Sequence, residues 1–188
     1  MKIESIRLKN FKSFRDIYLQ DIPSFLVIVG ANGTGKSTLF DVFGFLHDCL
    51  KSNVRQALDK RGRFKEVLSR ECDSHTIKIE IQYRMEIAEV ERLVTYSLEI
   101  SEQQNGPYVS REILRYKRGA YGSPFHFLDF TNGDGYAITN EEDFNKADEE
   151  LKRENQKVAP DTLAIKGLGQ FERFKAANAF RQLIESWH

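Results

Sequence analysis

A glycine-rich segment near the N-terminus has the residue types and the spacing of a phosphate-binding loop. Residues 30–37 read Gly-Ala-Asn-Gly-Thr-Gly-Lys-Ser, which fits the pattern G-x-x-x-x-G-K-[ST]. Glycines let backbone N–H groups close around phosphate oxygens, and a helix that begins here turns its positive end toward them. Lys36 adds a positive charge, and the hydroxyl group of Ser37 can bind Mg²⁺. The segment therefore predicts the binding of a nucleoside triphosphate.

Apolar residues on both sides of the loop predict the elements that hold it. Phe25–Val29 is a run of five apolar residues, which predicts a buried parallel strand that leads into the loop. After Lys36, apolar residues recur three and four positions apart, which predicts a helix to about Lys51 with one buried face. That face comprises Leu39, Val42, Phe43, Leu46 and Leu50. A glycine-rich turn alone need not bind anything. The motif predicts phosphate binding only where a strand precedes it and a helix follows it, as expected here.

The middle of the chain has the period of antiparallel strands. Residues 76–83 alternate between apolar and polar types, which is typical of a strand with one exposed face. A polar turn that contains glycine, 103–107, separates two further runs of this kind. The pattern favours a meander of hairpins over βαβ crossovers, with strands expected at 76–83, 93–101, 108–117, 125–130 and 135–138.

Smaller elements are expected before and after this meander. Residues 3–14 and 17–19 alternate in part and predict two strands, and residues 54–60 predict a short helix. A short strand is expected at 163–165. Residues 171–187 predict an amphipathic helix, because their apolar members recur at helical spacing.

A polar helix is expected over residues 141–155. Asn140 would cap it, and Glu149 and Arg153 would form an i,i+4 ion pair. Asn145–Asp148 within it matches the N-K-x-D pattern with which GTPases bind guanine. That pattern must follow a buried strand, and a polar segment precedes it here, so the match is treated as a coincidence.

The charge of the chain is balanced overall and uneven locally. Lys and Arg total 28, as do Asp and Glu, so net charge points to no partner of either sign. Basic residues gather in Lys51–Arg70 and Arg111–Arg118, which are either solvated faces or parts of a DNA-binding face. Cys49 and Cys72 do not form a disulfide framework, and neither a membrane-spanning run nor a signal peptide is found. We therefore expect a soluble cytoplasmic protein without membrane contact.

The opening of the chain and the loop together resemble a known family. Residues 9–14 read Lys-Asn-Phe-Lys-Ser-Phe, residues 32–33 of the loop read Asn-Gly, and residues 58–64 read Leu-Asp-Lys-Arg-Gly-Arg-Phe. This combination resembles the start of the ABC-type ATPase heads of SMC and RecF-like proteins. It is most similar to the bacterial predicted ATPases that are identified as members of the AAA family. The likeness covers most of residues 1–70 by motif and the remainder by layout.

The resemblance implies an α/β fold and a division of the chain. The fold would be a P-loop NTPase core, the N-terminal half of an ABC-ATPase head, with an antiparallel β-rich lobe and a C-terminal helix. Residues 1–70 would carry the loop, 71–138 the β lobe, and 139–188 the polar helix and the start of a helical lobe. Residues 1–188 would then be the N-terminal portion of a longer ATPase head.

The resemblance also implies roles for individual residues. Asn32 would lie near the γ-phosphate of ATP, and Lys12 would lie beside the nucleotide unless it is merely an exposed strand lysine. Gln170 would reach Mg²⁺ and the attacking water, unless it is a solvated glutamine in a turn. The expected ATP-binding residues are Gly30, Asn32, Gly33, Thr34, Gly35, Lys36, Ser37, Thr38 and Lys12, and the expected Mg²⁺ ligands are Ser37 and Gln170.

Three parts that ATP hydrolysis needs in this family are not found. These are a Walker B strand ending in Asp-Glu, a Ser-Gly-Gly-like signature loop and a downstream switch histidine. Asp129 ends an apolar run, but Phe130 follows it and the run belongs to the meander. Gly167–Gln170 lacks the serine of a signature loop, and Asp41–Gly44 matches the D-x-x-G pattern of GTPases only within the predicted helix. No catalytic residue is assigned, and no metal besides Mg²⁺ is expected.

Three functions follow from these features. In the first, the chain binds Mg-ATP as half of a site, and hydrolysis needs a C-terminal half. Relatives of this kind pair head to tail on ATP and act on DNA, in repair or phage defence beside a nuclease. In the second, the chain is a small P-loop kinase with Lys51–Arg70 as its lid, which the antiparallel meander disfavours. In the third, it is a nucleotide-gated DNA-binding module, which is compatible with the first.

Overall fold

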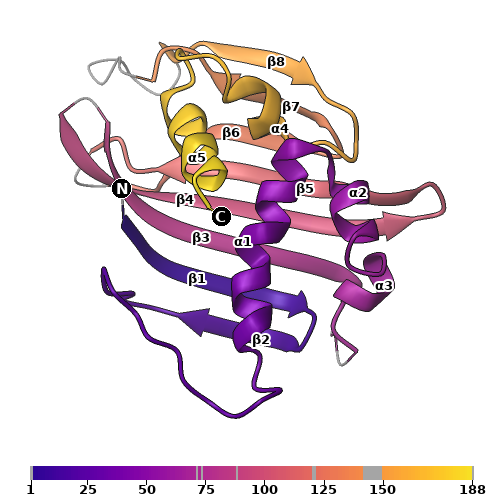
Figure 1. Cartoon of the computed structure of the whole chain (residues 1–188). Coiled ribbons are helices and arrows are strands. Elements are labelled where there is room, and N and C mark those ends of the chain that lie inside the picture. The colour runs from indigo at the N-terminus through magenta and orange to yellow at the C-terminus, as the bar shows by residue number, and fades with distance from the viewer. Residues whose placement is uncertain are drawn as a thin grey trace.

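A single antiparallel sheet organises the computed structural model, which describes residues 2–70, 72, 74–87, 89–119, 122–141 and 150–187. The described strands follow the order β2-β1-β3-β4-β5-β6-β7-β8, and each neighbouring pair is antiparallel (Figure 1). The strands are β1 (Lys2–Phe11), β2 (Phe14–Leu19), β3 (Thr76–Ile87), β4 (Val90–Gln103), β5 (Gly106–Tyr116), β6 (Phe125–Thr131), β7 (Asp134–Ile138) and β8 (Arg153–Lys157).

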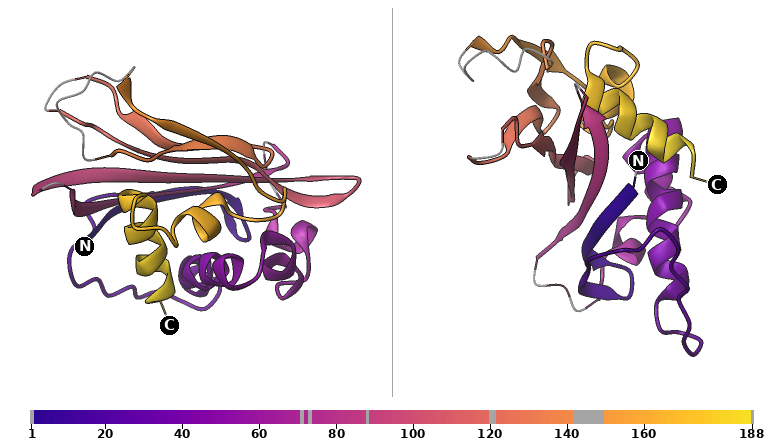
Figure 2. Two further views of the ribbon diagram at one scale, coloured as in Figure 1. Left: turned by 90° about the horizontal axis from the view of Figure 1, so that it is seen from above. Right: turned by 90° about the vertical axis from the view of Figure 1, so that its left-hand side faces the viewer.

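The helices gather on one face of this sheet, whereas β6 to β8 curve away on the other side (Figure 2). The first of them, α1, begins directly after the glycine-rich loop and crosses the strands, and α5 lies beside it (Figure 1). The helices are α1 (Lys36–Lys51), α2 (Val54–Asp59), α3 (Phe64–Val67), α4 (Ala164–Leu168) and α5 (Lys175–Glu185). None of the helices that the structure describes is long and apolar enough to cross a membrane.

Apolar side chains between the sheet and the helices form the core. Alternate residues of β3 from Ile77 to Tyr83 are buried, because successive side chains of a strand point to opposite faces. Phe180 of α5 stacks on Tyr83, with 4.9 Å between ring centroids, and its centroid lies 4.3 Å from that of Tyr96. Aromatic pairs of this kind contribute about 0.5–1.5 kcal/mol each beyond their burial. They hold α5 against the sheet.

Most of the predicted elements are confirmed. The strands β1 to β7 occupy the expected strand regions, and α1 and α2 occupy the expected helices. The expected C-terminal helix is α5, which begins only at Lys175. The buried face of α1 includes Phe45 instead of Phe43, which is half-buried and packs edge-on against Trp187. The antiparallel β-rich lobe and the C-terminal helix of the expected α/β fold are therefore both present.

The prediction of a polar helix over 141–155 is wrong for its C-terminal part. Residues 153–157 form β8, which pairs with β7, and their side chains alternate between exposed and half-buried positions. The Oδ1 atom of Asn140, the expected cap, accepts a hydrogen bond from the backbone N–H of Lys152 at 2.8 Å, just before β8. Residues 142–149, with Glu149 of the expected ion pair and the N-K-x-D match, lie outside the described residues.

The prediction of a strand at 163–165 is also wrong, because α4 begins there. The buried carboxylate of Glu112, on β5, accepts hydrogen bonds from the backbone N–H groups of Ala164 at 2.6 Å and Ile165 at 3.2 Å. These N–H groups have no partners within a helix, and a carboxylate at this end satisfies them. A distant residue thus decides the local structure, which the local sequence pattern cannot reveal.

The strand predicted before the glycine-rich loop is absent. Phe25–Val29 belongs to none of the described strands, and Phe25 and Val29 are 83% and 84% exposed. Only Ile28 within the run is partly buried against the core. The composition suits a buried parallel strand, but burial requires neighbouring strands, and the sheet ends at β2 without reaching this segment. The segment is therefore an exposed apolar connection.

Candidate nucleotide-binding site

Two glycines shape the loop that precedes α1. Gly33 and Gly35 have φ angles of 86° and 89°, a region that favours glycine, and Gly35 is the N-cap of α1. A Cβ atom at Gly35 would also lie 2.7 Å from Cε1 of Phe14, so any other residue would have to displace this ring. The ring of Phe14 therefore supports the loop where the helix begins, and only glycine fits there.

The side chain of Lys36 folds back over the loop. Its Nζ donates hydrogen bonds of 2.6 Å to the carbonyl oxygens of Gly30 and Ala31. It also lies 3.4 Å from Oγ1 of Thr34, which donates to the carbonyl oxygen of Ala31 at 2.9 Å. The ammonium group is thus held within the span of the loop, where its charge is available to a bound phosphate.

The Lys-Asn-Phe-Lys-Ser-Phe motif supports the start of α1. Asn10 is buried, has a φ angle of 56°, and donates its side-chain amide to the carbonyl oxygen of Thr76 at 2.9 Å. Ser13 donates from its hydroxyl group to Oγ1 of Thr38, the residue that follows the loop motif, at 3.2 Å. With the ring of Phe14 behind Gly35, these contacts explain structurally why the motif and the loop belong together.

Lys12 lies beside the first turns of α1. Its φ angle is 50°, which is uncommon outside glycine, and its backbone N–H donates to the carbonyl oxygen of Val67 at 2.6 Å. Its Nζ lies 2.5 Å from Oδ2 of Asp41. Its role beside a nucleotide remains a prediction, although the structure does bring it close to the loop helix. It lines a groove of about 560 Å³ whose walls also include Ser13, Arg15, Thr38, Lys65 and Arg70.

A chain of ion pairs ties α1 to the residues that follow α2. Arg61 donates from Nε to Oδ1 of Asp41 at 2.9 Å and from Nη1 to Oδ2 of Asp48 at 2.8 Å. Lys60 donates from Nζ to Oδ1 of Asp48 at 2.5 Å. Burial raises the pKa of Asp48, but the hydrogen bonds from Lys60 and Arg61 outweigh it, so the pKa of Asp48 is lowered overall.

The hydroxyl group of Ser37 fits a magnesium ion that is shared with a nucleotide. Ser37 is exposed in the first turn of α1, directly after Lys36. In the described part of the chain, no three His, Cys, Asp or Glu side chains gather as a metal site. Mg²⁺ prefers six oxygen ligands and usually keeps several waters, so one protein hydroxyl suffices when phosphates supply other ligands. The donor set suits Mg²⁺ that arrives with a triphosphate.

The structure does not bring Gln170 to the loop. Its Nε2 donates to the carbonyl oxygen of Lys166, and Nζ of Lys166 donates to the carbonyl oxygen of Ser52. Ser52 caps the C-terminal end of α1, whereas Ser37 lies in its first turn. A helix of 16 residues is about 24 Å long, and α4, which precedes Gln170, lies at the end of α1 away from the loop (Figure 1). Gln170 is therefore not a ligand here; it belongs to the α4–α5 turn.

Asp129, whose sequence setting partly resembles a Walker B aspartate, is engaged elsewhere. Its carboxylate lies 2.7 Å from Nη2 of Arg111 and 2.8 Å from Nδ1 of His126. The strand that carries it, β6, lies between β5 and β7 in the antiparallel sheet, away from the end of α1 where the loop lies (Figure 1). Asp41–Gly44 lies within α1, as expected, so neither aspartate has the setting of a catalytic motif.

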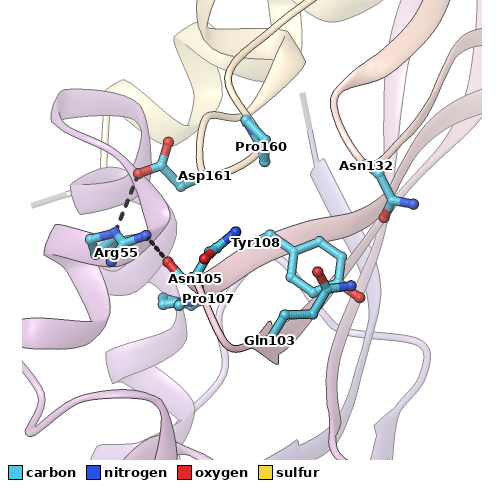
Figure 3. A pocket seen from close by; sticks show the side chains of 9 residues that line it. Arg55, Gln103, Asn105, Pro107, Tyr108, Asn132, Pro160 and Asp161 are labelled. Carbon is cyan, nitrogen blue, oxygen red and sulfur yellow. Dashed lines mark hydrogen bonds and ion pairs between the residues drawn. The ribbon is translucent and has the colours of Figure 1, made fainter.

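One hollow of the described chain lies away from the loop. It has a volume of about 300 Å³ and separates the β4–β5 turn from α2 and from the segment before α4 (Figure 3). Arg55 spans part of it, donating to the carbonyl oxygen of Asn105 at 2.6 Å and facing Asp161 at 3.8 Å. Because α2 follows the C-terminal end of α1, this hollow is separate from the candidate site at the loop.

Comparison with known proteins identifies the family of the chain. Residues 1–180 match the AAA ATPase domain. The chain belongs to this AAA ATPase family. The match extends from β1 into α5, so it covers both the loop and the antiparallel sheet of the AAA ATPase domain.

Two further likenesses are more limited. The chromosome partition protein Smc of Methanocaldococcus jannaschii is 53% identical to the AAA ATPase domain over 45 residues, which are 23% of this chain and 4% of that protein. The chain thus matches only a small part of the length of this relative. A solved structure from work on ATP-driven dimerization and DNA-stimulated activation of SMC ATPases has a TM-score of 0.41 and 22% identity. The alignment covers 66% of this chain and 72% of the chain in that structure.

Sequence reasoning assigned no role in the site to three residues. Phe14 backs the loop glycine, Asp41 holds Lys12, and Arg61 connects Asp41 to Asp48. Asp41 follows Ser37 by four residues, so helical spacing alone would have placed it one turn behind the loop. No sequence signal predicts the contacts of Arg61, because it follows α2 and its partners, Asp41 and Asp48, lie in α1.

Proposed function

We propose that this AAA ATPase domain binds ATP with Mg²⁺ at the loop before α1. The observation that supports this most is the position of the Lys36 ammonium over the loop, next to a helix start that Phe14 and Gly35 shape. The family match independently supports a nucleotide as the ligand. The proposed contacts are Gly30, Asn32, Gly33, Thr34, Gly35, Lys36, Ser37 and Thr38, with Lys12 alongside.

Each part of the loop has a definite task in this proposal. Backbone N–H groups at the start of α1 donate to the β- and γ-phosphates, whose negative charge the helix dipole stabilises. Lys36 exchanges the carbonyl oxygens of Gly30 and Ala31 for phosphate oxygens, which are charged and therefore stronger acceptors. Ser37 contributes its hydroxyl group to Mg²⁺, and bound Mg²⁺ neutralises part of the phosphate charge.

We propose that hydrolysis needs a further protein segment. Hydrolysis requires a general base within hydrogen-bond reach of the attacking water. Among the described residues, none of the aspartates discussed above has this position at the loop. The exposed run Phe25–Val29, which leads into the loop, supports this proposal, because it has the composition of a buried strand and lacks a neighbour. A strand alongside it could bring a Walker B Asp-Glu pair. Residues 1–188 would then form one portion of a P-loop ATPase head, with 1–70, 71–138 and 139–188 as its parts.

Self-association and DNA are proposed as further partners. In a longer protein that carries a signature loop, head-to-tail pairing on ATP would place the signature loop of one copy over the nucleotide of the other. DNA would be attracted by the groove beside Lys12, whose walls include Lys65 and Arg70. The run Arg111–Arg118 is less suitable, because Arg111 and Arg115 are paired with Asp129 and Glu80. A nuclease partner, in repair or phage defence, remains a prediction from family resemblance.

A self-contained P-loop kinase is disfavoured as the alternative. Such an enzyme needs parallel strands joined by crossovers, and every described strand pair is antiparallel. Lys60 and Arg61, within its expected lid, are held by Asp48. A lid must open and close, so residues fixed to α1 do not suit it.

Calorimetric titration with ATP and Mg²⁺, run beside a turnover assay, tests the proposal. We expect saturable binding that Lys36→Ala abolishes, together with turnover at background level. A matched control is Lys157→Ala, which removes an exposed lysine of β8, outside the loop motif and the groove beside Lys12, and should leave the loop geometry intact. Binding that survives Lys36→Ala would refute the assignment of the loop. Turnover that depends on Lys36 would show that this chain needs no further segment for hydrolysis.

A further inference from the structure

We propose that Asp41 and the phosphates of a bound nucleotide compete for the ammonium group of Lys12, so that Asp41 lowers the nucleotide affinity of the loop. The inference rests on the proposed nucleotide site and adds a residue that sets its affinity. Lys12 is near both its present partner and the loop helix: its Nζ is 2.5 Å from Oδ2 of Asp41, and it lines one groove with Thr38.

The two positions for the ammonium group are close together. Asp41 follows Thr38 by three residues in α1, which is about 4.5 Å along the helix axis. The backbone of Lys12 is fixed by the hydrogen bond from its N–H to Val67 and by its φ angle of 50°. Only the flexible four-carbon side chain therefore has to move. Non-glycine residues in this backbone region cluster at functional sites.

Lys12 is the less firmly held of the two cations on Asp41. Arg61 makes an aligned hydrogen bond to Oδ1 at 2.9 Å and is only 10% exposed. Lys12 is 32% exposed, and its contact with the buried Oδ2 atom lacks the geometry of a hydrogen bond. A phosphate that bears more charge than a carboxylate is the stronger partner for an ammonium group that can swing. Lys12 is therefore the cation that leaves Asp41 for the phosphates of the nucleotide.

Arg61 makes the exchange possible without leaving a carboxylate unpaired. When Lys12 leaves, Asp41 still accepts the hydrogen bond from Arg61, which is itself anchored by Asp48. Removing the partner of a buried charge is costly, and this second cation reduces that cost for Asp41. The part of the cost that remains, at Oδ2, is subtracted from the affinity for the nucleotide.

The test compares Asp41→Asn with Asp48→Asn in calorimetric titrations with ATP and Mg²⁺ at fixed ionic strength. Both changes remove one carboxylate partner of Arg61, but only Asp41 holds Lys12. We expect Asp41→Asn to bind ATP about fivefold more tightly and Asp48→Asn to bind as the unchanged chain does. Thermal unfolding of each variant checks that it is folded.

A second pair of variants keeps the test decisive if Asp41→Asn does not fold. Lys12→Gln should weaken ATP binding about fivefold, and Asp41→Asn should no longer tighten it in the Lys12→Gln background. Weaker or unchanged binding in a folded Asp41→Asn variant would overturn the proposal, as would unchanged binding in Lys12→Gln. If the unchanged chain binds no ATP, or Lys36→Ala still binds it, the proposed nucleotide site itself fails instead.

Discussion

At the scale of single residues, the site depends on positions where only one side chain fits. Gly35 has two separate requirements, a φ angle of 89° and the absence of a Cβ atom next to the ring of Phe14. Gly33 has a similar φ angle of 86°, but no atom lies within 4 Å of the place a Cβ would take. The two glycines therefore form a natural comparison between backbone strain alone and strain combined with a clash.

Gly35→Ala should destabilise the chain by about 2 kcal/mol or more and abolish ATP binding, because helix α1 can no longer begin in its present position. Gly33→Ala should cost only about 1 kcal/mol, the price of a left-handed backbone for alanine. Urea denaturation measures the loss of stability, and calorimetric titration measures the loss of ATP binding. Equal losses in the two variants would show that the ring of Phe14 does not restrict the loop.

Glu112 gives a second prediction at this scale, because it is fully buried on β5. Burial is the largest influence and raises its pKa from 4.5 to about 7, against the hydrogen bonds from Ala164, Ile165 and Tyr96. A raised pKa means that the folded chain favours the neutral acid. Its contribution to stability is present below pH 4.5 and is lost as the pH rises toward 7.

The free energy of unfolding should therefore fall between about pH 4.5 and 7 more steeply in the unchanged chain than in Glu112→Gln. The glutamine variant should also be less stable at low pH by about 1–3 kcal/mol, because its NH₂ group cannot accept a hydrogen bond. Glu99→Gln, which changes a partly exposed partner of Lys78, is the control and should leave the slope as it is. The same dependence of the free energy of unfolding on pH in all three proteins would contradict the titration of buried Glu112.

At the scale of elements, the exposed run before the loop can be tested against the core. Changing Phe25 to Ser and Val29 to Thr should alter the free energy of unfolding by no more than about 0.5 kcal/mol, since both side chains are exposed. Phe45→Ala, in the buried face of α1, should cost about 3–5 kcal/mol. Urea denaturation measures both. A large loss from the exposed pair would mean that the segment is buried after all.

The comparison between sequence and structure is also clearest among the elements. The period of two in β3 to β5 and the helical period of α1 are local, and both elements could be predicted. The start of α4 could not, because it depends on Glu112 from β5. The exposure of Phe25–Val29 could not either, because a pattern reports what a segment can bury and not whether a neighbour is present.

The candidate site was predictable to a different degree. The loop residues and the helix after them follow from one motif, whereas Gln170 was selected by its order in the chain and lies at the far end of α1. Lys12 was inferred from resemblance, and its partner Asp41 becomes apparent only in three dimensions. Residues that act through the backbone of a contiguous loop can thus be read from sequence, and residues that meet across elements cannot.

At the scale of the whole molecule, the helical layer and the sheet share one core. Trp187, the single tryptophan, packs against Phe43 at 4.8 Å and near Phe180 at 6.4 Å between ring centroids. Its fluorescence therefore reports on the junction of α1 with α5. Far-ultraviolet circular dichroism reports on the secondary structure of the sheet and the helices together.

We expect both signals to change at the same urea concentration, because small domains with one core unfold cooperatively. Phe180→Ala should lower that concentration for both signals together, with a loss of about 3–5 kcal/mol. Separate transitions, with the fluorescence change at lower urea, would show that the junction of α1 with α5 opens before the secondary structure unfolds.

Helix α1 extends from the glycine-rich loop to Ser52, which accepts a hydrogen bond from Lys166 of α4. A rigid rod of about 24 Å works as a lever: tilting its loop end by about 5° would displace its other end by about 2 Å. Shifts of that size are large enough to repack a helix against its neighbours. Mechanical strain produced at the loop would therefore emerge at α4, on the far side of the molecule from the phosphates.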